Sequence, residues 1–227
     1  MNKSIKPRLL AVTVLCAAVM GCAGAPKPIA YSNLQSASYM ARNAKGDAKH
    51  MPYRYSTDVD WLAYNKLIID PVVIYQGPDQ QFGSMSDADK AVLTDYMAEQ
   101  FSATLRQRFT IVTSASPGTL RLKLTLTGAT KTKPVVGTFT RLDIGGNIYN
   151  SVQSVRGGRG AFTGEAIYAV ELYDAQTDRL LEAYVARQYP RPYNVKATFG
   201  SLTAAQVGIK KGADALLEHL WESRKAQ

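Results

Sequence analysis

Alternation of hydrophobic and polar residues predicts strands in the second half of the chain. In residues 120–126 leucine occupies every second position, and basic or hydroxyl side chains stand between the leucines. Residues 162–173 alternate in the same way, and residues 180–189 follow after the turn sequence DAQTDR. A period of two is typical of a strand with one face in the core and one in water. Glu165 and Glu171, on the more polar face of the second strand, are therefore predicted to be solvated.

Two other segments carry the helical period. In residues 87–108 a large apolar side chain recurs at every fourth position, beginning at Leu93. Ser86 stands before this run and Asp89 three residues later, an arrangement similar to a capping box. In residues 201–224 apolar side chains form one stripe and charged side chains face the other way. Both segments are predicted to be amphipathic helices.

Before the first helix, residues 67–75 are dense in β-branched and aromatic side chains and predict a buried strand, with Pro71 at a bulge or an edge. The stretch PVVIYQGP is interpreted as an ordinary connection from this strand to the helix, with a ligand-binding loop as the alternative. The order strand, helix, several antiparallel strands and helix indicates an α+β domain. We expect an antiparallel or mixed β-sheet with two amphipathic helices packed on one face.

Residues 22–57 lack both periods and contain prolines and small polar residues. They are predicted to form a flexible tether, with the folded domain at 58–227. Some side chains in this segment are expected to pack along the domain surface rather than to form a separate binding motif: Tyr31, Leu34, Tyr39 and Met40.

The amino-terminal residues 1–21 have the features of a cleaved secretory signal, with a basic start, the apolar run 9–19 and a small-residue end. The sequence VMGC ending at Cys22 resembles the lipobox of bacterial lipoproteins, which implies acylation of Cys22 and cleavage before it. Ala23, in place of aspartate, implies sorting to the outer membrane. A simple signal peptide with an incidental thiol is the alternative.

Charge is concentrated in one region of the mature chain. Removal of residues 1–21 takes three basic side chains and leaves 206 residues, and the formal net charge falls from +9 to +6. Between residues 131 and 160 one acidic residue stands among five basic ones, which are candidate contacts for an anionic partner: Lys131, Lys133, Arg141, Arg156 and Arg159. A solvated loop without a partner is the alternative. The nearby glycines precede a strand, not a helix, so they do not predict a nucleotide site.

Catalytic chemistry finds little support in the residue types. The chain has two histidines, His50 and His219, and neither HExxH nor GxSxG is present. Glu165 and Glu171 lie six positions apart on one predicted strand, about 20 Å, which is too far for a glycosidase pair. We therefore expect no catalytic, cofactor-binding or metal-binding residues, and export argues against a nucleic-acid partner.

Several stretches resemble the bacterial lipoprotein family called domain of unknown function 3313. They are DVDWLAYNKLIIDPVVIY, GTLRLKLTLTGA, FTGEAIYAVELYDAQTDRLL and the carboxy-terminal helix. The likeness extends from about residue 53 to residue 222. The resemblance implies the location and the fold and implies no catalytic residue. Asp178 departs from the family pattern, which commonly has glycine there, so a positive φ is expected at this position.

These observations predict a lipid-anchored outer-membrane lipoprotein that faces the periplasm. Its expected role is that of a non-enzymatic accessory, assembly or interaction protein of the cell envelope. The first alternative is a binding module for peptidoglycan, anionic lipid or lipopolysaccharide through the basic loop 131–160. An envelope hydrolase and display on the cell surface are further alternatives.

Overall fold

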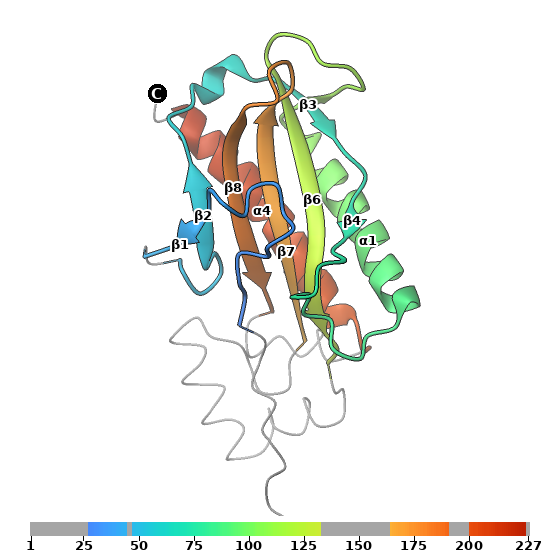
Figure 1. Cartoon of the computed structure of the whole chain (residues 1–227). Coiled ribbons are helices and arrows are strands. Elements are labelled where there is room, and N and C mark those ends of the chain that lie inside the picture. The colour runs from blue at the N-terminus through green and yellow to red at the C-terminus, as the bar shows by residue number, and fades with distance from the viewer. Residues whose placement is uncertain (1–26, 45–46, 133–163, 191–199, 226–227) are drawn as a thin grey trace, which may run out of the picture.

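The described chain is built on one mixed β-sheet with helices packed on one face (Figure 1). The structure is a computed structural model and describes residues 27–44, 47–132, 164–190 and 200–225. The predicted α+β class is confirmed, and the sheet is mixed. The predicted signal peptide and the candidate lipidation site, Cys22, lie outside the described residues.

The centre of the sheet consists of three long antiparallel strands, as the alternation predicted. β6 (Thr119–Thr130) pairs with β7 (Glu165–Asp174), and β7 pairs with β8 (Leu180–Gln188). The even-numbered leucines of β6 point toward the helices and are buried, so its odd-numbered side chains point to the opposite face. We call that opposite side the outward face of the sheet.

Shorter strands complete both sides of the sheet. β2 (Tyr53–Ser56) pairs with β8, and β1 (Ala41–Arg42) pairs with β2, both antiparallel. On the other side β3 (Lys66–Ile69) and β4 (Val73–Ile74) run parallel to β6, and β5 (Thr110–Ile111) runs parallel to β3. The strand predicted at 67–75 is therefore divided in two at Pro71, whose ring nitrogen has no hydrogen to donate to a ladder.

Among the described residues, two α-helices cover the inner face side by side (Figure 1). α1 (Asp87–Leu105) begins at Ser86, whose side chain accepts a hydrogen bond from the backbone of Asp89, so the predicted cap is confirmed. α4 (Thr203–Lys225) buries its predicted apolar stripe. A 3₁₀ turn, η1 (Trp61–Ala63), lies against α4.

The described part of residues 22–57 is attached to the fold more fully than a tether. The expected packing is confirmed for three of the four residues named, and Tyr39 is 57% exposed. Tyr31, Leu34 and Met40 are buried on the outward face, where they pack with apolar residues of β7 and β8. β1 and β2 then join the sheet, so the folded domain begins before residue 58. Burial of a few apolar side chains attaches this segment to the sheet. Their spacing along the sequence is irregular, so no strand or helix period revealed it. We call residues 27–40 the N-terminal layer.

The prediction that Glu165 and Glu171 face water is wrong, because the N-terminal layer covers the outward face of β7. Both glutamates are buried, as is Glu182 on β8. Each is matched by donors: Arg187 binds Glu165 at 2.8 Å, and the backbone N–H of Ser36 binds Glu171 at 2.8 Å. A buried carboxylate requires such partners.

Gly164 and Asp178 occupy backbone positions with particular requirements. Gly164 lies against the neighbouring strand, since a Cβ at this position would come within 2.5 Å of the carbonyl oxygen of Thr130. Asp178 has a φ of 53°, in the left-handed region, as the departure from the family pattern predicted. Its carboxylate lies 3.6 Å from Arg121 on the surface.

Asp178→Gly should raise the melting temperature. The left-handed conformation costs a non-glycine residue about 1–2 kcal/mol, and the greater freedom of glycine in the unfolded chain offsets about half of this gain. The net increase in stability should be about 1 kcal/mol or less, measured by thermal unfolding. Asp178→Ala, which keeps the unfavourable φ, should not stabilise, and equal melting temperatures for both variants would contradict the explanation.

Leu34→Ala should destabilise the protein because Leu34, in the N-terminal layer, is only 8% exposed and packs against the sheet. Truncation of a buried leucine costs about 2 kcal/mol or more. The matched control is Leu62→Ala, since Leu62 is 55% exposed and its truncation should change the free energy of unfolding by less than about 0.5 kcal/mol. Denaturant unfolding distinguishes the two, and equal midpoints would mean that residues 27–40 do not form part of the fold.

Candidate functional site

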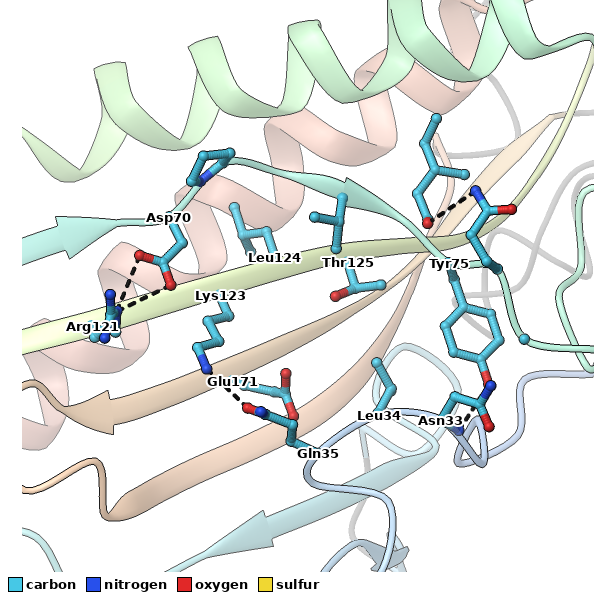
Figure 2. Close-up of a pocket in the computed structure, with 15 residues that line it drawn as sticks. Asn33, Leu34, Gln35, Asp70, Tyr75, Arg121, Lys123, Leu124, Thr125 and Glu171 are labelled. Atoms are coloured by element: carbon cyan, nitrogen blue, oxygen red, sulfur yellow. Dashed lines mark hydrogen bonds and ion pairs between the residues drawn. The ribbon is translucent and has the colours of Figure 1, made fainter.

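A groove of about 740 Å³ lies on the outward face, where the N-terminal layer does not cover β6 (Figure 2). Residues 33–35 of that layer form one wall, and residues 70–77 form the other. The floor is made by outward side chains of β6, with Glu171 of β7 beside them. We call this the outward groove.

The sequence positions these groups through strand alternation and two local restrictions. Arg121, Lys123 and Thr125 occupy the odd positions of β6, so all three point out of the sheet into the groove. Pro71 interrupts the strand that forms the wall. Gly77 is needed because a Cβ there would lie 2.2 Å from the phenol oxygen of Tyr75.

An ion pair closes one end of the groove. The Nε of Arg121 lies 3.1 Å from both carboxylate oxygens of Asp70, and an Nη lies 3.6 Å from Asp178. The hydrogen bond and the charge of Asp70 raise the pKa of Arg121. Because both groups are partly exposed, the pair contributes little to stability and is accessible to a ligand.

The middle of the groove is a polar chain that crosses from the sheet to the N-terminal layer. Lys123 donates to the amide oxygen of Gln35 at 2.9 Å and lies 4.6 Å from the centre of the Tyr173 ring. The phenol of Tyr173 donates to Gln35 at 3.2 Å. Burial and the neighbouring Glu171 carboxylate raise the pKa of Tyr173, so it remains a donor.

At the other end, side chains of the wall hold backbone amides of the N-terminal layer. Tyr75 donates to Asp79 at 2.6 Å and accepts from the backbone N–H of Asn33 at 3.0 Å. The second oxygen of Asp79 accepts from the backbone N–H of Ser32 at 2.9 Å. Burial acts to raise the pKa of Asp79, but these hydrogen bonds outweigh it and hold the pKa below its ordinary value.

The groove continues past Gln35 into a second hollow lined by tyrosines. Tyr39 and Tyr55 have ring centroids 5.3 Å apart, and Tyr173 and Arg179 also line this part. Lys123 and Arg121 border both parts, so the two form one surface. This surface combines exposed aromatic rings, cationic donors and apolar side chains.

Of the predicted site residues, only Lys131 belongs to the described part of the chain, and it does not line the groove. Lys131 lies at the end of β6 and forms an ion pair of 2.5 Å with Asp89 at the start of α1. The other predicted contacts lie outside the described residues: Lys133, Arg141, Arg156, Arg159 and the lipidation site Cys22. Part of the stretch PVVIYQGP, interpreted as an ordinary connection, lines the groove. The polar residues that alternate with leucine in β6 were the feature of the sequence from which the floor of the groove could have been predicted.

The histidines serve other contacts. His219 of α4 lies 2.8 Å from the buried carboxylate of Glu182, which also pairs with Arg54 at 2.8 Å. His50 stacks on Tyr189 at 4.7 Å, and burial and nearby cations lower its pKa. Within the described ranges, no group of three or more His, Cys, Asp or Glu side chains is placed to hold a metal ion.

No described helix combines the length and the hydrophobicity needed to cross a bilayer.

Comparison with known proteins gives a family and two distant structural similarities. The profile of the family described as “Protein of unknown function (DUF3313)” matches residues 30–216. No curated protein matches. The PelC dodecamer from Paraburkholderia phytofirmans is 8% identical, with a TM-score of 0.37 and coverage of 72% of this chain and 94% of that chain. A leucine-to-methionine variant of it is 10% identical, with the same TM-score and coverage.

Tyr75→Phe should raise the pKa of Asp79 toward its ordinary value of 3.8, because the variant loses the phenol donor. In the native protein the depressed pKa means that this carboxylate stabilises the fold above about pH 4 and that the contribution is lost as the pH falls through the lower, folded value. A carboxyl NMR titration measures both proteins. Asp174, whose pKa is lowered by separate hydrogen bonds from Thr177 that outweigh burial, is the internal control. An unchanged Asp79 titration would contradict the proposed bonding.

Proposed function

We propose the following function for this chain, which belongs to the family described as “Protein of unknown function (DUF3313)”. We propose that it is a lipid-anchored protein of the outer membrane, facing the periplasm and acylated at Cys22. Its role is that of a non-enzymatic accessory or assembly protein of the cell envelope, which binds a partner through the outward groove.

The observation that carries this proposal is the docking of the N-terminal layer on the sheet. Five residue steps separate Cys22 from Lys27, where the described chain begins, and they span at most about 18 Å. An acyl anchor at Cys22 would therefore hold the domain against the bilayer rather than at the end of a long tether. A protein held in this way acts on components within reach of the membrane surface.

The outward groove suits binding because its polar groups are already arranged in hydrogen-bonded sets. Asp70 is paired with Arg121, and Glu171 accepts a hydrogen bond from the backbone N–H of Ser36. Such groups offer fixed positions for hydrogen bonding to a partner. Exposed apolar surface, above all the 52% exposed Val73, lies beside them. Apolar surface with a few oriented polar groups is typical of a binding site.

A second candidate function is contact with anionic lipid, lipopolysaccharide or peptidoglycan through residues 131–160. The supporting observation is that Lys27, the end of β6 and the start of β7 lie at the same end of the sheet. The carbonyl of Lys27 accepts from Gln81, which bridges to Gly128 near the end of β6. Gly164, at the start of β7, donates to Thr132. The basic segment thus leaves and re-enters the fold at the end of the sheet where Lys27 begins (Figure 1).

Cys22→Ser should move the protein from the membrane fraction to the soluble or unprocessed fraction, because acylation requires the thiol. The measurement is fractionation of cells together with the mass of the mature amino terminus. Wild-type protein should start at residue 22 and carry the mass of its acyl chains. An unmodified Cys22, or a Cys22→Ser variant that stays with the outer membrane, would refute the anchor.

A photo-crosslinking amino acid at position 73 should capture a specific envelope protein in intact cells. Position 92 is the matched control, since Val92 is also a valine, is 48% exposed and lies on α1 on the other side of the sheet. The captured protein is identified by mass spectrometry and then tested by copurification. Val73→Arg should abolish copurification and Val92→Arg should not. Identical behaviour at the two positions would reject the groove as the partner site.

A further inference from the structure

We infer that the outward groove takes an extended peptide segment of a partner protein, with a carboxylate side chain that binds Lys123. This inference rests on the proposed function, because it specifies the chemistry of the partner for the same groove. Three observations support it. The outward face already binds one segment of polypeptide, the N-terminal layer. Hydrogen-bond donors remain over β6, and their spacing matches that of an extended chain.

The outward face already binds a largely irregular segment, the N-terminal layer, and the contacts are of a consistent kind. Apolar side chains such as Tyr31 and Leu34 are buried against β7 and β8. Between them, backbone N–H groups of Ser32, Asn33 and Ser36 donate to side-chain oxygens of the sheet and of the 70–79 segment. Acceptors on this part of the surface thus match the donors of a polypeptide.

Over β6 the chemistry is reversed, because the floor presents donors. Lys123 carries three N–H donors, and one of these is directed to Gln35. Arg121 carries five donors in a planar fork, and Thr125 adds a hydroxyl. A segment that lay along β6 would meet these donors with carbonyl or carboxylate oxygens. The groove is therefore complementary to a chain that is rich in acceptors.

Lys123 is the best-placed partner for a carboxylate. Arg121 is already engaged by Asp70 and Asp178, whereas Lys123 is directed to a neutral amide oxygen. Glu171 stands opposite Lys123 in the strand register, but the backbone N–H of Ser36 already donates to it at 2.8 Å. A carboxylate that replaced the Gln35 oxygen would add the attraction between opposite charges to the hydrogen bond that the Lys123 ammonium already forms.

The spacing of the floor fits an extended chain. Arg121, Lys123 and Thr125 recur every second residue, so their origins are about 6.7 Å apart along β6. Alternate side chains of an extended peptide have the same repeat. The walls supply apolar contacts from Leu34 and Val73, and the tyrosines beyond Gln35 supply aromatic contacts. An extended peptide over β6 would therefore complete the layer that residues 27–40 begin.

The test is selection of binders from a displayed library of random peptides on the full mature protein, followed by affinity measurements. Selected peptides should share an Asp or Glu at one fixed position. Lys123→Glu should weaken their binding by about tenfold or more, since it removes the cation and adds repulsion. Peptides with Lys at the shared position should bind Lys123→Glu better than the wild type. Lys210→Glu, on the exposed surface of α4, is the control and should change affinity less than twofold.

A second variant, Val73→Glu, keeps the test valid if Lys123→Glu lowers the melting temperature. It narrows the groove without changing the floor, and it should also abolish binding. Peptides with no acidic preference, or binding that Lys123→Glu leaves unchanged, would overturn the inference. Binding of purified glycan strands or anionic vesicles in place of peptides would also overturn it. If position 73 crosslinks a protein in cells while no acidic peptide binds, the proposed function stands and this inference fails.

Discussion

The fold depends on the burial of the outward face of β7 and β8 beneath residues 27–40. An antiparallel sheet with helices on one side can leave its second side in water, and the alternating sequence of β6 suits that arrangement. Here Tyr31, Leu34 and Met40 cover Ile167, Ala169, Ala183 and Val185 instead. β7 and β8 are consequently enclosed between two layers, and this enclosure is why Glu165 and Glu171 require hydrogen-bonding partners inside the protein.

The outward groove is a consequence of the same layer, because it exists where the layer stops. Residues 33–35 end the covered area, and the segment 70–77 faces them across β6 (Figure 2). The hydrogen bonds from Ser32 and Asn33 to Asp79 and Tyr75 fix the distance between these walls. The shape of the groove and the attachment of the amino-terminal segment are therefore not independent properties. A change in one alters the other.

The sequence allowed the periodic part of the fold to be predicted and little else. The leucines of β6, the fourfold spacing in α1 and the stripe of α4 each repeat often enough to identify an element. The N-terminal layer has no repeat, since its anchors are separated by three and six positions. Ile167 and Ala169 lie between the two glutamates on the same face of β7. These two apolar residues were the feature of the sequence that could have indicated a covered face. The groove combines residues from four distant segments, so only tertiary structure reveals it.

The attachment of Lys27 has a mechanical consequence for a chain anchored through its amino terminus. Tension applied at that end enters the fold through the carbonyl of Lys27, which is bonded to Gln81, and next reaches Tyr31. A force directed away from the sheet would load these contacts one after another, as in peeling, rather than all at once. The layer over β7 and β8 would yield first, while the hydrogen-bonded ladders between β6, β7 and β8 remain intact.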